Sequence, residues 1–115
     1  MNEDSEYIRS AVMNHTKYFS DSLPMIASEN LISPMAKEML ITDFHNRYAE
    51  GVVGERYYEG NHFVDRVEER AIDLACKLFG CEYADVRPIS GTVANMAVYF
   101  ALTEPGDLVS ATALA

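Results

Sequence analysis

The order of apolar patterns along this chain predicts an α/β fold built on a parallel sheet. Residues 83–88 have the composition of a short strand, residues 90–102 show helical spacing, and residues 108–112 again indicate a strand. A strand, a helix and a second strand in this order are typical of a βαβ unit, whose strands lie parallel. Because 115 residues supply only about two strands, we expect the chain to be the beginning of a larger domain.

The first part of the chain is predicted to be mainly helical. Apolar residues at helical spacing predict an amphipathic helix over residues 4–19. Residues 23–34 contain two prolines and are predicted to form a loop. Ser33 and Pro34 combine a capping hydroxyl with a proline at the first helical position, so a second helix is expected from there to about Phe44.

Residues 47–61 have a composition that fits neither a helix nor a regular strand, with three glycines and three tyrosines in fifteen residues. Tyrosines in a glycine-bearing loop beside Glu and Arg suggest a surface that holds a ligand or partner. The alternative is a loop whose aromatic rings only cover a core. After this segment, Asn61 is a plausible cap for a strong helix that ends at Gly80.

Charge and composition exclude several classes of function. The formal net charge is −9 and no basic cluster is present, which argues against a nucleic-acid partner. No apolar run approaches the ~20 residues of a membrane span, and the acidic N-terminus is unlike a secretory signal, so a cytoplasmic location is expected. Cys76 and Cys81 are interpreted as buried thiols of a reducing compartment. The three histidines have no ligand-like spacing, so no metal site is expected.

Two features carry possible chemistry. Ser90, Gly91 and Thr92 open a predicted helix, where free backbone N–H groups and small hydroxyls suit a phosphate or carboxylate, although such a triplet is often only a cap. Glu50 lies between Tyr48 and Gly51. A glutamate partly desolvated among aromatic rings can exchange protons near neutral pH. The alternative is a salt bridge from Glu50 to Arg47 or Arg56.

Three segments together resemble the serine hydroxymethyltransferase family. They are LPMIASEN at 23–30, RYAEGVVGERYYEGN at 47–61 and RPISGTVANMAVYFAL at 87–102, in the family's order and with about its spacing. The resemblance covers the chain from roughly Leu23 onward. It implies a fold-type I, aspartate aminotransferase-like enzyme that uses pyridoxal 5'-phosphate. Such an enzyme moves a one-carbon unit between serine and a reduced pterin, leaving glycine.

The resemblance also implies a domain organisation and an oligomer. Residues 1–46 would form an N-terminal helical arm, and residues 47–115 an interface loop and the incomplete beginning of the cofactor-binding large domain. Two subunits of a homodimer would share their active sites.

Roles for individual residues follow from the resemblance alone. For the cofactor, Tyr48 would reach the phosphate held by the neighbouring subunit. Ser90, Gly91 and Thr92 would bind the phosphate of their own subunit's cofactor. The last assignment agrees with the anion-binding character of a helix N-terminus.

The same resemblance implies roles in substrate binding and catalysis. Ser28 would help hold the carboxylate of the amino acid. Glu50 would be the proton-handling carboxylate beside the serine hydroxyl and the pterin carrier. Tyr57 would pack on the carrier, and Tyr58 would lie close to the substrate and act in catalysis.

Four positions depart from the family's common pattern. Ile89 stands where histidine is frequent, Val93 where glutamine is frequent, Glu55 where lysine is common, and Glu59 where glycine is common. Archaeal-type members often share such replacements and tend to use tetrahydromethanopterin in place of tetrahydrofolate. The departures concern the identity of the carrier more than the reaction class.

The resemblance places the family's catalytic lysine beyond residue 115, and none of Lys17, Lys37 and Lys77 matches its position. We therefore expect the chain alone to be inactive. Two alternatives remain open at this point. One is a related pyridoxal-phosphate enzyme with threonine aldolase or transaldolase activity. The other is a non-catalytic truncated product that binds a full-length subunit.

Overall fold

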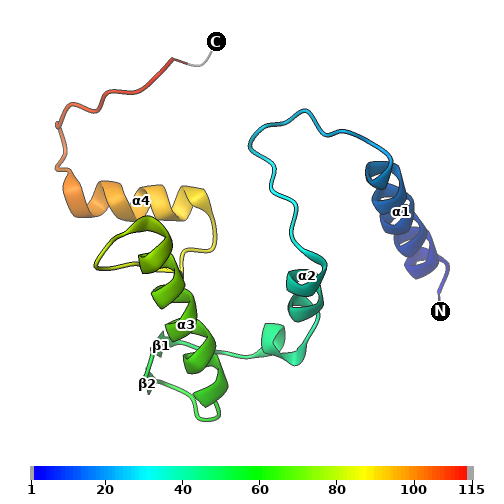
Figure 1. Cartoon of the computed structure of the whole chain (residues 1–115), viewed down its shortest axis with the longest axis horizontal. Helices are drawn as coiled ribbons and strands as arrows, with labels where there is room; N and C mark the ends of the chain where they lie inside the picture. Colours follow the sequence, from blue (N-terminus) through cyan, green and yellow to red (C-terminus); the bar gives the residue numbers. More distant parts are fainter. Residues whose placement is uncertain (1, 114–115) are drawn as a thin grey trace. The chain divides into compact units, whose positions relative to one another are not determined.

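The computed structural model describes residues 2–113, which divide into two compact units (Figure 1). The first unit extends to His45 and the second begins at Asn46. Each unit is described by itself below. The arm and domain roles expected for residues 1–46 and 47–115 concern the intact protein and stay predictions.

The first unit begins with α1, Glu3–Ser20, which confirms the helix expected over residues 4–19. Asn2 caps it, because its side-chain oxygen accepts a hydrogen bond from the Ser5 N–H at 2.8 Å. Three acidic residues in the first turn and Lys17 in the last turn match the helix dipole. Local chemistry at both ends therefore explains the bounds of α1.

The second helix, α2, covers Pro34–Leu40 and is shorter than expected. Its start is as predicted, since the Ser33 hydroxyl accepts from the Ala36 N–H at 3.2 Å. Its end differs because Thr42 donates its hydroxyl to the Met39 carbonyl at 2.9 Å, which competes with continuation of the helix. A short 3₁₀ helix, η1, follows at Asp43–Asn46 in place of the helical turn expected up to Phe44.

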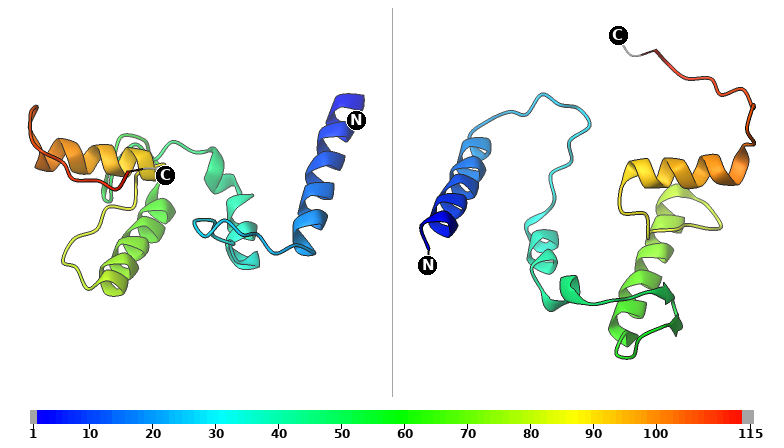
Figure 2. Two further views of the ribbon diagram at one scale, coloured as in Figure 1. Left: turned by 90° about the horizontal axis from the view of Figure 1, so that it is seen from above. Right: turned by 180° about the vertical axis from the view of Figure 1, so that it is seen from behind.

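The second unit contains a small hairpin within the glycine- and tyrosine-rich segment (Figure 2). Strand β1, Gly51–Val52, pairs antiparallel with β2, Glu55–Arg56, in the register Gly51 with Arg56 and Val52 with Glu55. The reversal passes through Gly54, whose φ of 79° suits the second position of a two-residue turn. The expectation that this segment contains no strand is therefore wrong for these four residues.

Two helices complete the second unit. Helix α3, His62–Phe79, ends at Gly80 with φ 63°, as the pattern predicted. Helix α4, Gly91–Leu102, starts at Ser90, whose side chain accepts from the Val93 N–H at 3.2 Å. Asn61 occupies the N-cap position of α3, as predicted, but its side chain makes no capping hydrogen bond.

The two predicted parallel strands are not formed. Residues 83–88 and 108–112 have no regular structure, and the only sheet within residues 2–113 is the antiparallel pair β1–β2. A parallel strand exists only where neighbouring strands pair with its backbone. At 83–88 the Asp85 carboxylate instead accepts from the Arg87 N–H at 2.9 Å, a local bond that satisfies that backbone group.

The described residues bury very little apolar surface. No hydrophobic side chain among residues 2–113 is buried, and Asn61, at 6% exposure, is the one buried polar residue. Helix α4 is apolar nearly all round, a composition typical of helices covered by other protein. No helix in this part of the chain is long and apolar enough to cross a membrane.

The two cysteines differ in their environment. Cys76 is half-buried and Cys81 is exposed, and both are free thiols. Burial first, and then the neighbouring Cys81, raises the pKa of the Cys76 thiol. The prediction of two buried thiols is therefore wrong for Cys81, which follows the glycine that ends α3.

Candidate active site

The hairpin segment brings four of the predicted site residues together. The Tyr57 N–H donates to the Glu50 carbonyl at 3.0 Å, which extends the pairing of β1 and β2 outward by one residue on each side. The rings of Tyr48 and Tyr58 lie with centroids 5.6 Å apart and tilted by 37°. Tyr48, Glu50, Tyr57 and Tyr58 are thus presented by one short stretch of paired backbone.

Asn61 holds the open end of this hairpin. Its Nδ2 donates to the carbonyl oxygens of Tyr48, at 3.1 Å, and Tyr58, at 2.9 Å. A side-chain amide has two N–H donors, so one buried side chain can join the two approaching segments. Sequence reasoning missed this role, because an asparagine before a helix is most often a cap.

Arg56 fastens the hairpin to α3. Its Nε donates to Asp65 Oδ1 at 2.7 Å and its Nη2 to Glu68 Oε2 at 2.6 Å. Its Nη1 donates to the carbonyls of Ala49, at 2.7 Å, and Gly51, at 3.1 Å. The hydrogen bonds with Glu68 and then Asp65 raise the pKa of the Arg56 guanidinium above its usual value.

Glu50 itself is exposed, so the prediction that aromatic rings partly desolvate its carboxylate is wrong for the described part of the chain. Its tyrosine neighbours in the chain and across the hairpin do not enclose it, since Tyr48 and Tyr57 are each 78% exposed. The alternative in which Glu50 pairs with Arg56 is also wrong, because Asp65 and Glu68 bind that guanidinium. Glu50 is exposed, and the alternative in which it pairs with Arg47 stays a prediction.

The start of α4 has the features of an anion-binding site. Within residues 2–113 the N–H groups of Gly91 and Thr92 have no acceptor, while the Val93 N–H bonds to Ser90 Oγ. No acidic residue lies in the first turn, and a Cβ added at Gly91 would meet no atom within 4 Å. Two free donors, the dipole of a twelve-residue helix and two hydroxyls fit a phosphate dianion.

Ser28 lies in the first unit, apart from the other predicted residues in the chain. It is exposed in a turn closed by a hydrogen bond from the Glu29 N–H to the Ile26 carbonyl at 3.1 Å. Ser28 thus belongs to the first unit, whereas the hairpin residues belong to the second.

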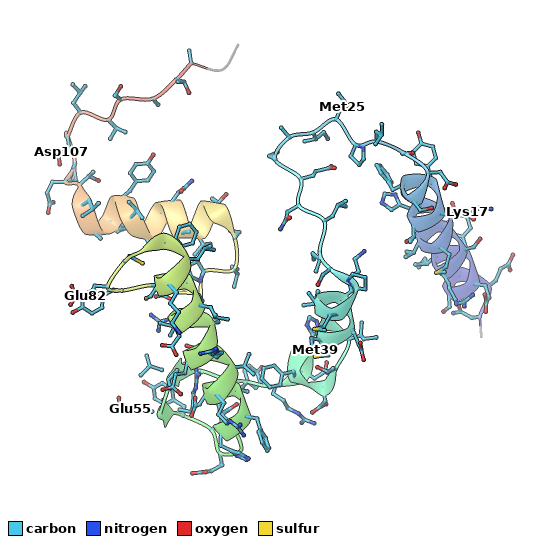
Figure 3. All side chains as sticks on the ribbon, in the orientation of Figure 1. Lys17, Met25, Met39, Glu55, Glu82 and Asp107 are labelled. Atoms are coloured by element: carbon cyan, nitrogen blue, oxygen red, sulfur yellow. The ribbon has the colours of Figure 1, made fainter. Side chains whose placement is uncertain are left out.

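A shallow cavity of about 250 Å³ opens between the hairpin and the first turns of α3. Of the predicted site residues only Tyr58 lines it, together with the two residues that hold the hairpin, Arg56 and Asn61. Glu59 lies at the same cavity. Glu55 is on the adjoining strand β2, where Figure 3 labels it. Two of the four departures from the family pattern thus lie in the same hairpin segment.

Known proteins resemble this chain over nearly its whole length. A protein named serine hydroxymethyltransferase from Thermoplasma acidophilum is 51% identical over 112 residues, which cover 97% of this chain and 26% of the relative. Proteins of the same name from Picrophilus torridus and Korarchaeum cryptofilum are 52% identical over 108 residues and 53% identical over 104 residues. They are covered to 25% and 24% of their own length, with 94% and 90% of this chain matched.

The chain thus spans about a quarter of the length of these curated relatives. The family profile described as serine hydroxymethyltransferase matches residues 1–115. The profile covers the whole chain, and about half of the aligned positions are identical in each relative. The chain belongs to the serine hydroxymethyltransferase family.

Proposed function

We propose that this chain is part of a cytoplasmic, homodimeric hydroxymethyltransferase that transfers a one-carbon unit between serine and a reduced pterin, giving glycine. The activity is proposed for an intact enzyme that contains this segment, since the chain spans about a quarter of its relatives. The observation that carries the proposal is the start of α4. There the family's phosphate-binding triplet coincides with two unpaired backbone N–H groups.

Pyridoxal 5'-phosphate, when bound, supplies an electron sink for the bonds at the α-carbon of the amino acid. Ser90 and Thr92 would donate their hydroxyls to its phosphate, and the N–H groups of Gly91 and Thr92 would add two backbone donors. Tyr48 would donate its hydroxyl to the phosphate in the neighbouring subunit. Its 78% exposure in this chain leaves the phenol free for such a contact.

The remaining proposed roles concern the substrates. Ser28 would help hold the amino-acid carboxylate, and Tyr58 would lie beside the reacting groups. Glu50 would accept the proton of the serine hydroxyl as the one-carbon unit leaves, while Tyr57 packs on the pterin. The carrier is a reduced pterin of the tetrahydrofolate or tetrahydromethanopterin class. Glu55 and Glu59 place two carboxylates in the hairpin segment. The charge of the carrier is therefore the property that would decide between the two pterin classes.

The first test uses an intact chimera, in which this chain replaces the matching segment of a full-length relative. Glu50→Gln should keep cofactor binding, followed by absorbance, and lower serine cleavage by about 10²-fold. Glu38→Gln, at an exposed glutamate of α2, is the matched control and should leave turnover unchanged. Unchanged turnover in Glu50→Gln would show that Glu50 does not handle the proton.

The alternatives are separated by two further measurements. Serine cleavage that depends on an added reduced pterin supports the transferase, whereas threonine cleavage without a carrier favours an aldolase. The intact mass of the native protein should be several times the 12.9 kDa of this chain. A native mass of 12.9 kDa, with a complex between the chain and a full-length subunit on size exclusion, would instead support the truncated binding partner.

A further inference from the structure

We propose that Arg56 is a positioning residue for the reaction, because it holds the backbone on both sides of Glu50 and so sets where the Cα–Cβ bond of Glu50 points. The inference rests on the proposed function, since it takes Glu50 as the proton-handling group. Nothing in the resemblance or in the comparisons assigns a role to Arg56.

The contacts of Nη1 carry the proposal. This one nitrogen donates to the carbonyls of Ala49, at 2.7 Å, and Gly51, at 3.1 Å, the two residues that flank Glu50. The carbonyl of Glu50 itself accepts from the Tyr57 N–H at 3.0 Å. Three successive carbonyls are therefore held, and the orientations of the peptide units around a residue determine where its Cα–Cβ bond points.

The other end of the guanidinium is anchored to a rigid element. Asp65 and Glu68 lie three positions apart on α3, so both carboxylates face the same side of the helix. The side chain of Arg56 is only 5% exposed, and those of Asp65 and Glu68 are 23% and 15% exposed. Asp65 also accepts from the Gly54 N–H at 3.3 Å in the hairpin turn. The hairpin is thereby tied to α3 at its turn and beside Glu50.

Only arginine can make this set of contacts. Its planar guanidinium presents N–H donors in a fixed fork, which lets Nε and Nη2 face two carboxylates while Nη1 reaches two carbonyls. Lysine keeps the positive charge but concentrates its donors on one nitrogen. Arg56→Lys should therefore keep the attraction to α3 and lose the simultaneous hold on the carbonyls that flank Glu50.

A positioning role and a purely structural role predict different kinetics. Misplacing a catalytic group lowers kcat in the fraction of enzyme that has bound its cofactor and leaves the KM for serine nearly unchanged. Loss of structure lowers the amount of folded, cofactor-containing protein, with normal kcat in the remainder. Activity is therefore expressed per bound cofactor, measured by absorbance.

The test compares Arg56→Lys, Glu50→Gln and the double variant in the intact chimera. We expect Arg56→Lys to lower kcat by about 10-fold to 10²-fold with little change in KM. The double variant should be no slower than Glu50→Gln alone, because the position of a missing carboxylate has no effect. Arg70→Lys is the matched control, since Arg70 also lies on α3 and forms an exposed ion pair with Asp73 at 3.9 Å.

Each outcome has one meaning. A large loss of kcat in Glu50→Gln, together with full kcat in Arg56→Lys, overturns the positioning role alone. A double variant in which the two losses of kcat multiply also overturns it. Unchanged kcat in Glu50→Gln overturns the proposed role of Glu50 and the positioning role with it. If Arg56→Lys does not fold, Glu68→Gln tests the same anchor. It should lower kcat several-fold, and again add nothing to Glu50→Gln.

Discussion

The side-chain amide of Asn61 donates a hydrogen bond to the carbonyl oxygen of Tyr48 at 3.1 Å, although thirteen positions separate the two residues. The same nitrogen donates to the Tyr58 carbonyl at 2.9 Å. Strands of two residues each make few ladder hydrogen bonds, so a hairpin this short is marginal by itself. The buried amide supplies a closure that the backbone pairing does not.

Replacing Asn61 with alanine should therefore loosen the hairpin without shortening α3. The change leaves two carbonyls without their donor, at a cost of about 1–3 kcal/mol. Because the Asn61 side chain does not cap α3, the helix should keep its protection. Hydrogen exchange followed by mass spectrometry in the intact chimera should show faster exchange in residues 48–58 only. Asn14→Ala, at an exposed asparagine of α1, is the control, and equal exchange in the two variants would contradict the closure role.

Two glycines of the hairpin should differ in their tolerance of alanine. Gly51 has φ 111°, and a Cβ there would overlap the Glu55 carbonyl oxygen and come within 3.0 Å of Arg56 Cα. Gly54 has φ 79° with open space around it. We expect Gly54→Ala to cost about 1 kcal/mol from its backbone conformation alone, and Gly51→Ala about 2–4 kcal/mol because a clash is added. Urea unfolding of the intact chimera measures both, and equal costs would mean that the close approach at Gly51 is relieved by the backbone.

Gly91 allows the proposed phosphate site to be tested without breaking its helix. Proline is well tolerated at the first position of a helix, and Ser90 already has the extended conformation that a following proline needs. Gly91→Pro removes one of the two free N–H donors, so affinity for pyridoxal phosphate should fall about 10-fold. Gly91→Ala keeps the donor and should bind normally. Equal affinity in the two variants, measured by cofactor titration of the intact apoenzyme, would show that this N–H does not contact the phosphate.

Asp85 should make the stability of the folded chain depend on pH at acidic pH. Its hydrogen bonds with Arg87 lower the pKa of the Asp85 carboxyl to about 2. Because the pKa of this carboxyl is lower in the folded chain than in the unfolded chain, the ionised form stabilises the fold at pH values above the ordinary aspartate pKa of about 4. This contribution is lost as the pH falls toward the lowered pKa. Since both side chains are about half exposed, solvent and salt weaken this contribution.

Carbon NMR of the Asp85 carboxyl should detect the shift directly. In Arg87→Gln the midpoint should move up toward the ordinary aspartate value, whereas Arg9→Gln, on an exposed surface of α1, should leave it unchanged. An unshifted midpoint in Arg87→Gln would mean that the Asp85–Arg87 pair does not persist in solution.

The helices were predictable because their determinants are local. Ser33 and Ser90 cap α2 and α4 through hydrogen bonds to N–H groups three positions away, and Gly80 ends α3 through its own backbone conformation. The exception is the end of α2, because no sequence pattern predicted the hydrogen bond from the Thr42 hydroxyl to the Met39 carbonyl. Strands 83–88 and 108–112 failed as predictions because a parallel strand is defined by pairing with segments distant in the sequence, which local composition does not specify.

By itself the sequence determined the family, the helices and the residue types of the site, since local periodicity, capping chemistry and motif order are all written along the chain. Tertiary structure alone decided that Arg56 binds α3 and not Glu50, that Asn61 closes the hairpin, and that Glu50 is exposed. These contacts join residues nine to thirteen positions apart. Which of several possible partners each side chain binds depends on how the hairpin folds back on α3. No local sequence pattern specifies that arrangement.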